Sequence, residues 1–243
     1  MKSLPLSIFC IAISSCSLFS DTVQWATWSS PSSFNNSSYG NAYATTTTGL
    51  IAAPSGQSVV VSLNGEILQT GSYFNTSLPG FTYGGTYATP EQTWTSTRVS
   101  NLPGNSDQIC LTGGAVSIQT LTFDKAVKDI FLDIGSLGSW SGPVSPTWTF
   151  NQSFVLLSQD SDFNRTAHNN PFSISGNSLT GTESSGTILF SGTFTSLSWT
   201  VTGATSTEYA NYTVGVSTVP EPSALSLLAV GLGGLAMMRH RRS

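Results

Sequence analysis

Residues 59–70 read VVVSLNGEILQT, and no other stretch of the 243-residue chain carries so clear a signal for local structure. Two runs of strand-forming residues flank the dipeptide Asn64-Gly65. Asn-Gly between such runs favours a two-residue β-hairpin, because both turn positions need positive φ. The sequence therefore predicts a hairpin whose turn is formed by Asn64 and Gly65.

The rest of the chain continues this pattern. Apolar and polar residues alternate with a period of two in most segments, which is typical of strands with one buried face. The runs 116–123 and 126–134 flank Asp124-Lys125, and this predicts a second hairpin. Further strands are predicted at residues 23–28, 43–48, 94–99, 147–150, 154–158, 172–175, 186–190, 197–201 and 210–216.

The number and spacing of these strands indicate the fold class. Ten to thirteen short strands, separated by Gly, Pro, Asn and Ser, are typical of a two-sheet antiparallel sandwich. We predict an all-β, jelly-roll-like sandwich in which the first and last strands pair. An antiparallel barrel is the alternative.

The composition narrows the choice of partners. Charged residues make up 8% of the chain, whereas they make up about a quarter of an average protein. Ser and Thr together make up about 30% of the chain. Residues 21–219 contain four basic and eleven acidic side chains, a net charge of −7. Because phosphate binding needs clustered Lys and Arg, we expect no nucleic acid partner and no binding to anionic lipid.

The first twenty residues predict export. Lys2 precedes an apolar run at residues 4–13 and small residues at Ser14 and Ser15, as in a secretory signal peptide that is removed. Cleavage after Ser17 and cleavage after Ser20 both fit. Residues 13–16 also loosely resemble a lipoprotein box, in which Cys16 would carry the lipid, but Ser15 before the cysteine is less usual than Gly or Ala.

Export places the remaining cysteine outside the reducing cytosol. Once Cys10 and Cys16 are removed with the leader, Cys110 is the one cysteine left, so no intramolecular disulfide can form. Cys110 lies in an apolar run, and we expect it to be a buried core residue.

The C-terminal end has three parts in a fixed order. They are the tripeptide Pro220, Glu221 and Pro222, an apolar run that begins at Ala224 and ends at Met238, and the basic residues Arg239, Arg241 and Arg242. The prolines hold the tripeptide extended. The apolar run would form a helix roughly 22 Å long, which is short for a hydrocarbon core of about 30 Å. The arginines should stay cytoplasmic.

This tail resembles the PEP-CTERM sorting signal that exported proteins of many Gram-negative bacteria carry. The resemblance covers residues 219–242 and implies recognition by an exosortase, a membrane protease-transpeptidase, with Pro220, Glu221 and Pro222 as the recognition motif. It divides the chain into a signal peptide (1–20), an exported β domain (21–218) and the sorting signal (219–243). The expected location is the inner membrane in transit, then the outer surface or the extracellular matrix.

The exported part offers little catalytic chemistry. His168 is its one histidine, and Trp140 stands where a G-x-S-x-G nucleophile motif would have serine. Asp129 and Asp133 are four residues apart on one predicted strand, roughly 13 Å, which is wide for a glycosidase pair. We therefore expect no enzyme, and a secreted glycoside hydrolase is the least favoured reading.

Two weaker candidates concern ligands. Asp160, Asp162 and Asn164 are spaced like the start of a calcium loop, although Arg165 stands where glycine is needed and Pro171 where a glutamate is needed. Trp140, in a Gly- and Ser-rich segment, is the first candidate for stacking on extracellular polysaccharide. The other aromatic candidates are Trp25, Trp28, Trp94, Trp148, Tyr73, Tyr83 and Tyr87.

The sequence thus favours a non-catalytic exported surface or matrix protein that is sorted, and processed, through its C-terminal signal. A surface carbohydrate-binding module is the alternative. Neither the composition nor the strand pattern identifies the ligand of the β domain.

Overall fold

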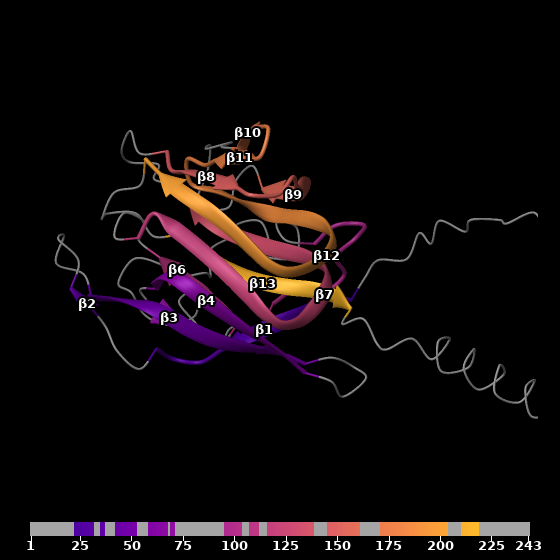
Figure 1. Cartoon of the computed structure of the whole chain (residues 1–243). Coiled ribbons are helices and arrows are strands. Elements are labelled where there is room, and N and C mark those ends of the chain that lie inside the picture. The colour runs from indigo at the N-terminus through magenta and orange to yellow at the C-terminus, as the bar shows by residue number, and fades with distance from the viewer. Residues whose placement is uncertain are drawn as a thin grey trace, which may run out of the picture.

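The computed structural model describes residues 22–31, 35–36, 42–52, 58–67, 69–70, 95–103, 107–111, 116–138, 145–160, 171–203 and 210–218. All of their regular structure is β, which confirms the all-β prediction (Figure 1). None of these segments is a helix long and apolar enough to cross a membrane. The predicted signal peptide (1–20) and C-terminal helix lie outside the described residues.

The strands in chain order are β1 Gln24–Trp28, β2 Asn35–Asn36, β3 Ala42–Ile51, β4 Val59–Ile67, β5 Gln69–Thr70, β6 Ile109–Leu111, β7 Ile118–Leu137, β8 Thr147–Phe150, β9 Val155–Asp160, β10 Ser173–Ser175, β11 Ser178–Thr180, β12 Ser184–Thr202 and β13 Ala210–Thr218. Every described pairing between them is antiparallel.

The sheet closes on itself through β7. One edge of this strand pairs with β12 from Ile118 to Leu137. Its other edge pairs with β4 near its start and with β13 towards its end. Because β4 also pairs with β3, β3 with β1 and β1 with β13, these five strands form a closed ring.

The structure therefore corrects the prediction of a jelly-roll-like sandwich of two separate sheets. The ring is barrel-like, and the alternative that we gave describes it better. The reason lies in β7 and β12, which have 20 and 19 residues and so extend for about 60 Å. Register shifts along the pair mark β-bulges. Bulges bend strands, and the bend lets β7 pair with β4 near its start and with β13 towards its end.

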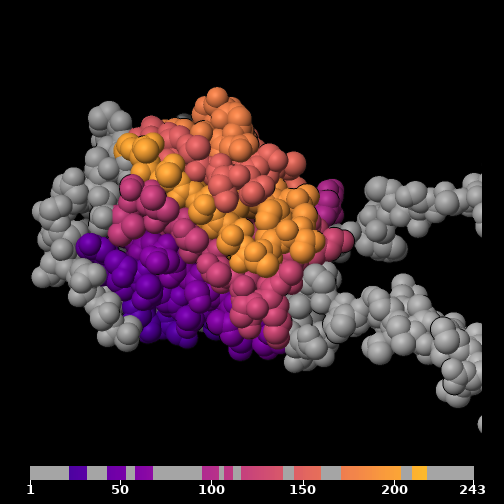
Figure 2. All heavy atoms as spheres, viewed as in Figure 1, coloured from indigo at the N-terminus to yellow at the C-terminus, as the bar shows by residue number. Residues whose placement is uncertain are grey.

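The first and last strands pair, as predicted. Gln24 lies opposite Val216, and Trp25 lies opposite Gly215. The start of β1 and the end of β13 are therefore neighbours, so the two ends of the described domain emerge side by side. Figure 2 shows these early and late segments within one packed body.

Both predicted hairpins are wrong. β4 runs straight through Asn64 and Gly65, and Asn64 pairs with Thr46 on one side and Thr120 on the other. β7 likewise continues through Asp124-Lys125 because β12 follows it on both sides of that point. The carboxylate of Asp124 instead accepts a hydrogen bond from the Val60 N–H at 2.9 Å.

The main core fills the inside of the ring. In β4, Val59, Val61 and Leu63 are buried, whereas Val60 and Ser62 between them are exposed. Trp148, Trp199 and Tyr212 meet at the centre, with ring centroids 5.6 to 5.7 Å apart. This is edge-to-face and tilted packing of the kind that stabilises aromatic clusters.

A second, smaller core lies on the opposite face of β7 and β13. It consists of Val23, Trp25, Val99, Phe131 and Leu189. We call residues 95–103, which supply Val99, the strap. The predicted strand at 94–99 does not form in the described residues: the Ser96 N–H donates to the Val99 carbonyl at 3.0 Å instead.

The strap is tied to β1 by hydrogen bonds. The Asn101 side chain accepts from the Val23 N–H and donates to the Val23 carbonyl, both at 2.8 Å. The Trp25 indole donates to the Asn101 carbonyl at 3.3 Å. These contacts hold the strap against the outer face of the ring, where the polar residues described next are found.

Candidate functional site

The sorting residues follow directly on the last strand. Pro220, Glu221, Pro222, Ala224, Met238, Arg239, Arg241 and Arg242 all lie outside the described residues. β13 ends at Thr218, which still pairs with Lys128. The folded ring therefore extends to within two residues of Pro220.

Three of the aromatic candidates for sugar binding are core residues. Trp25, Trp28 and Trp148 are buried, so none of them offers a flat face to a sugar. Trp140, Trp94, Tyr73, Tyr83 and Tyr87 lie outside the described residues, and their role stays a prediction.

Of the three residues predicted to bind calcium, only Asp160 lies within the described residues. Asp160 is the last residue of β9, where its backbone pairs with Ser185. Asp162 and Asn164 lie outside the described residues. Among the residues that are described, no three His, Cys, Asp or Glu side chains gather closely enough to hold a metal.

The carboxylates that were weighed for hydrolysis have structural partners. Asp129 accepts hydrogen bonds from the Gly192 N–H at 2.8 Å and from the Ser217 hydroxyl at 3.4 Å. One oxygen of Asp133 accepts from the Thr187 hydroxyl at 2.6 Å. Both groups therefore stabilise the pairing of β7 with its neighbours.

A third buried acid joins β4 to the start of β7. The Glu66 carboxylate accepts from the Val116 N–H at 3.2 Å, and the Glu66 N–H donates to the Gln119 side chain at 2.8 Å. Gln119 in turn donates to the Val116 carbonyl at 3.0 Å. Hydrogen bonds thus link the three residues in a partly buried network beside Gly65.

Cys110 is a core residue, as predicted. Its side chain is buried. Burial, with a smaller effect of the nearby Glu66 carboxylate, raises the pKa of the Cys110 thiol far above its usual value. Since the thiolate is the reactive form, this thiol is not an activated nucleophile.

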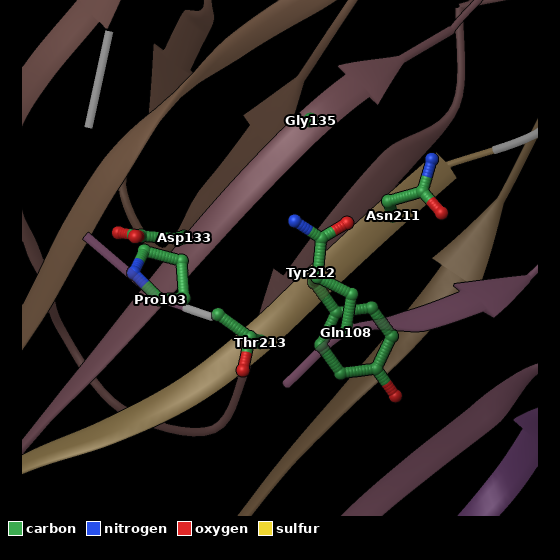
Figure 3. Close-up of a pocket in the computed structure, with 7 residues that line it drawn as sticks. All are labelled: Pro103, Gln108, Asp133, Gly135, Asn211, Tyr212 and Thr213. Carbon is green, nitrogen blue, oxygen red and sulfur yellow. The ribbon is translucent and has the colours of Figure 1, made fainter. Parts of the chain in front are cut away.

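The polar group that sequence reasoning missed lines a small cavity on the outer face of the ring. Figure 3 shows its lining, in which Asp133 and Gly135 come from β7, Asn211 to Thr213 from β13, and Pro103 and Gln108 from the segments beside them. The volume open to the centre of a water molecule is about 10 Å³. This is roughly the smallest cavity that holds one water.

Four of the residues that line the cavity each carry a buried oxygen atom without a hydrogen-bond partner. These atoms are Gln108 Oε1, Asp133 Oδ2, Asn211 Oδ1 and Thr213 Oγ1. Burial raises the pKa of the Asp133 carboxyl well above its usual value, and the bond from Thr187 only partly opposes this. Sequence patterning does not reveal these positions as buried, because Asn211 and Thr213 alternate with apolar residues just as solvent-facing positions do.

Comparison with known proteins gives one finding. The family model for the PEP-CTERM protein-sorting motif matches residues 218–242. Neither the comparison with curated proteins nor that with solved structures gives a match. The matched segment begins at Thr218, the residue at which β13 ends.

Proposed function

The chain carries a PEP-CTERM protein-sorting motif, and we propose that it is a non-catalytic exported protein of the cell surface or extracellular matrix. The motif supports sorting of an exported protein by an exosortase, a membrane enzyme. It is the single observation that carries the proposal. The role that we propose for the β domain after sorting goes beyond what the motif supports.

The position of the motif supports processing at the membrane. Its first residue is the last residue of β13, so a cut near Glu221 would release the ring without breaking a described strand pair. The tail itself is a short apolar run with basic residues after it, which suits a segment that is held briefly and then removed.

The fold is consistent with a structural role for the domain. Asp129, Asp133 and Glu66 each accept a hydrogen bond from a neighbouring strand or loop. Surface solubility rests mainly on hydroxyl groups, as in the exposed Ser62, Thr122 and Ser196. Extracellular polysaccharide is the partner that we propose for this location, with Trp140 as the contact to test.

The test compares Glu221→Gln with Glu208→Gln in cells that have an exosortase. Glu221→Gln keeps the side-chain volume and removes the one charge in the recognition tripeptide, so we expect processed protein to fall at least tenfold while the precursor accumulates at the membrane. Glu208→Gln removes an equal charge outside the tripeptide and should be processed normally. Intact mass and cell fractionation measure both.

Two outcomes would count against the proposal. If Glu221→Gln were processed and located as the wild type is, the tail would act only as an apolar anchor. If Glu208→Gln failed as well, the effect would belong to the folding of the domain and not to recognition of the motif.

A further inference from the structure

Asp133 is a buried carboxyl group in the middle of three paired strands. Its side chain is 3% exposed. Thr187 of β12 lies directly opposite it on one side, and Thr213 of β13 lies opposite it on the other. Phe131, two residues away along β7 and therefore on the same face, belongs to the smaller core. The carboxyl group thus lies on the face of β7 that the smaller core covers.

The hydrogen bonds of this group do not suit a carboxylate. The Thr187 hydroxyl donates to Oδ1 at 2.6 Å, but Oδ2 is buried without a hydrogen-bond partner. Among the described residues, no cationic side chain bonds to either oxygen. A buried carboxylate with one hydrogen bond and no cation is strongly destabilised, because it has lost its water without compensation. The neutral carboxylic acid avoids this cost.

The neutral acid also gains a donor where β13 offers an acceptor. A carboxylate only accepts hydrogen bonds, whereas the protonated group has one O–H to donate. Register places the Cβ atoms of Asp133 and Thr213 about 5 Å apart, and Thr213 Oγ1 is buried without a partner. Asp133 can therefore accept from Thr187 on one side and donate to Thr213 on the other.

The charged groups on the surrounding elements do not favour ionisation. The titratable and charged residues of these elements are Arg98, Asp107, Cys110, Asp129, Asp160 and Tyr212. Arg98 is the one cation among them, and it is exposed on the strap. The Asp107 and Asp129 carboxylates accept from the Thr27 hydroxyl and the Gly192 N–H, and further negative charge would only repel an ionised Asp133. Burial raises the pKa of Cys110 and of Tyr212, so both stay neutral.

We propose that Asp133 is a pH-sensitive link between β12, β7 and β13. As the neutral acid it joins Thr187 to Thr213 across β7. When the pH rises it loses its proton, and the new charge has to be hydrated. The cavity beside it has room for about one water, so β13 and the segment that carries Gln108 must move apart to admit more. The outer face of the ring therefore loosens in alkaline medium, while the main core on the other face stays packed.

The direction of the effect follows from the pKa of the group in the two states. Burial raises the pKa of the Asp133 carboxyl well above its usual value, and the bond from Thr187 lowers it by less. In the unfolded chain the usual pKa of about 3.9 applies. The contribution of Asp133 to stability is therefore complete below that pH and is lost as the pH rises through the folded-state pKa. The inference does not depend on the sorting proposal, since it concerns the folded ring alone.

Infrared spectroscopy of the full chain, purified in a detergent without carboxyl groups, is the direct test. At about pH 6, where ordinary carboxyl groups are ionised, the wild type should show the C=O band of a protonated carboxyl group. The band should disappear as the pH is raised and should be absent from Asp133→Asn. Asp124→Asn is the matched control: it changes an exposed carboxylate on the same strand, which accepts from the Val60 N–H at 2.9 Å, and it should keep the band.

Thermal unfolding tests the link between the proton and the fold. Asparagine at position 133 is close in volume to the neutral acid and cannot ionise. Relative to Asp133→Asn, the Tm of the wild type should fall by about 3–5 °C for each pH unit above about pH 5, until the carboxyl group has ionised. Beyond that pH, amide hydrogens of residues 131–135 and 211–215 should exchange at least tenfold faster in the wild type than in the variant, whereas those of β3 and β4 should exchange alike.

Three results would overturn the proposal. If the wild type had no protonated carboxyl band at about pH 6, Asp133 would be an ordinary carboxylate, and this result needs no variant that folds. If the band persisted in Asp133→Asn and vanished in Glu66→Gln, the proton would belong to Glu66, the buried acid of β4. If the Tm of the wild type and that of Asp133→Asn changed in parallel with pH, Asp133 would not link the strands through its proton.

Discussion

Gly65 shows how one residue type can serve two different purposes. In a hairpin turn, glycine after asparagine supplies positive φ. In this chain Gly65 sits inside β4, and a methyl group added there would overlap the side-chain oxygen and amide carbon of Gln119. That oxygen accepts the hydrogen bond from the Glu66 N–H. The glycine is needed because another side chain crosses directly over it.

This predicts the outcome of substitution at position 65. Gly65→Ala should lower the free energy of unfolding by about 1–3 kcal/mol, because Gln119 must move and the buried Glu66 N–H loses its acceptor. Chemical denaturation of the purified chain measures the change. Asn64→Ala, at an exposed position next to it, should change stability by less than about 0.5 kcal/mol.

A second substitution distinguishes a Gly65 in a hairpin turn from a Gly65 inside a strand. A type I′ turn accepts asparagine at positive φ, so Gly65→Asn would be mild if the hairpin existed. In the strand described here it should be at least as harmful as Gly65→Ala. A mild effect of Gly65→Asn on stability would therefore indicate that Asn64 and Gly65 form a turn.

At the scale of the strands, the bend of β7 depends on Asp129. This residue has a φ of 51°, a conformation that Asp and Asn adopt more readily than other non-glycine residues. Its carboxylate accepts from the Gly192 N–H at 2.8 Å, where β12 shifts register. The Asp129 side chain thus stabilises the bulge at which β7 and β12 bend.

Substitution of Asp129 tests this role. Asp129→Ala should cost about 1–3 kcal/mol, because it leaves the Gly192 N–H without its acceptor and places alanine at positive φ. Asp129→Asn keeps an accepting oxygen and tolerates the same φ, so it should cost less than half as much. Equal losses in the two variants would show that the negative charge, and not the bond and the backbone, is what matters.

The same strands show what the sequence could and could not predict. Strand positions with clear alternation were found, since residues 147–150 coincide with β8 and the last strand was placed at 210–216 within β13. The two hairpins failed because Asn64-Gly65 and Asp124-Lys125 are local turn cues that long-range pairing overrode. The polar residues that line the cavity were missed for a related reason: Asp133, Thr213 and Gln108 come from three segments that only the register of β13 brings together.

At the scale of the whole molecule, β13 closes the ring. It pairs with β1, β6 and β7, and its Tyr212, Val214 and Val216 are buried in the main core. The strand is also the element next to the sorting motif, which begins at Thr218. The last strand of the folded domain therefore ends where the sorting motif begins. Truncation of the chain near this point can test whether the domain folds without the motif.

A chain that stops after Val219 should fold as the full chain does, because no described strand pair extends beyond Thr218. Its Tm should lie within about 2 °C of the full-length value, and secretion without the tail should leave it soluble. A chain that stops after Gly203 lacks β13, so β1 and β7 lose the strand that joins them. Trp148 and Trp199 also lose their contact with Tyr212. This shorter chain should show no cooperative unfolding transition. If instead the chain ending at Val219 failed to fold while keeping every described strand, the tail would have to contribute to the stability of the ring, and the division into a self-sufficient domain and a removable signal would be wrong.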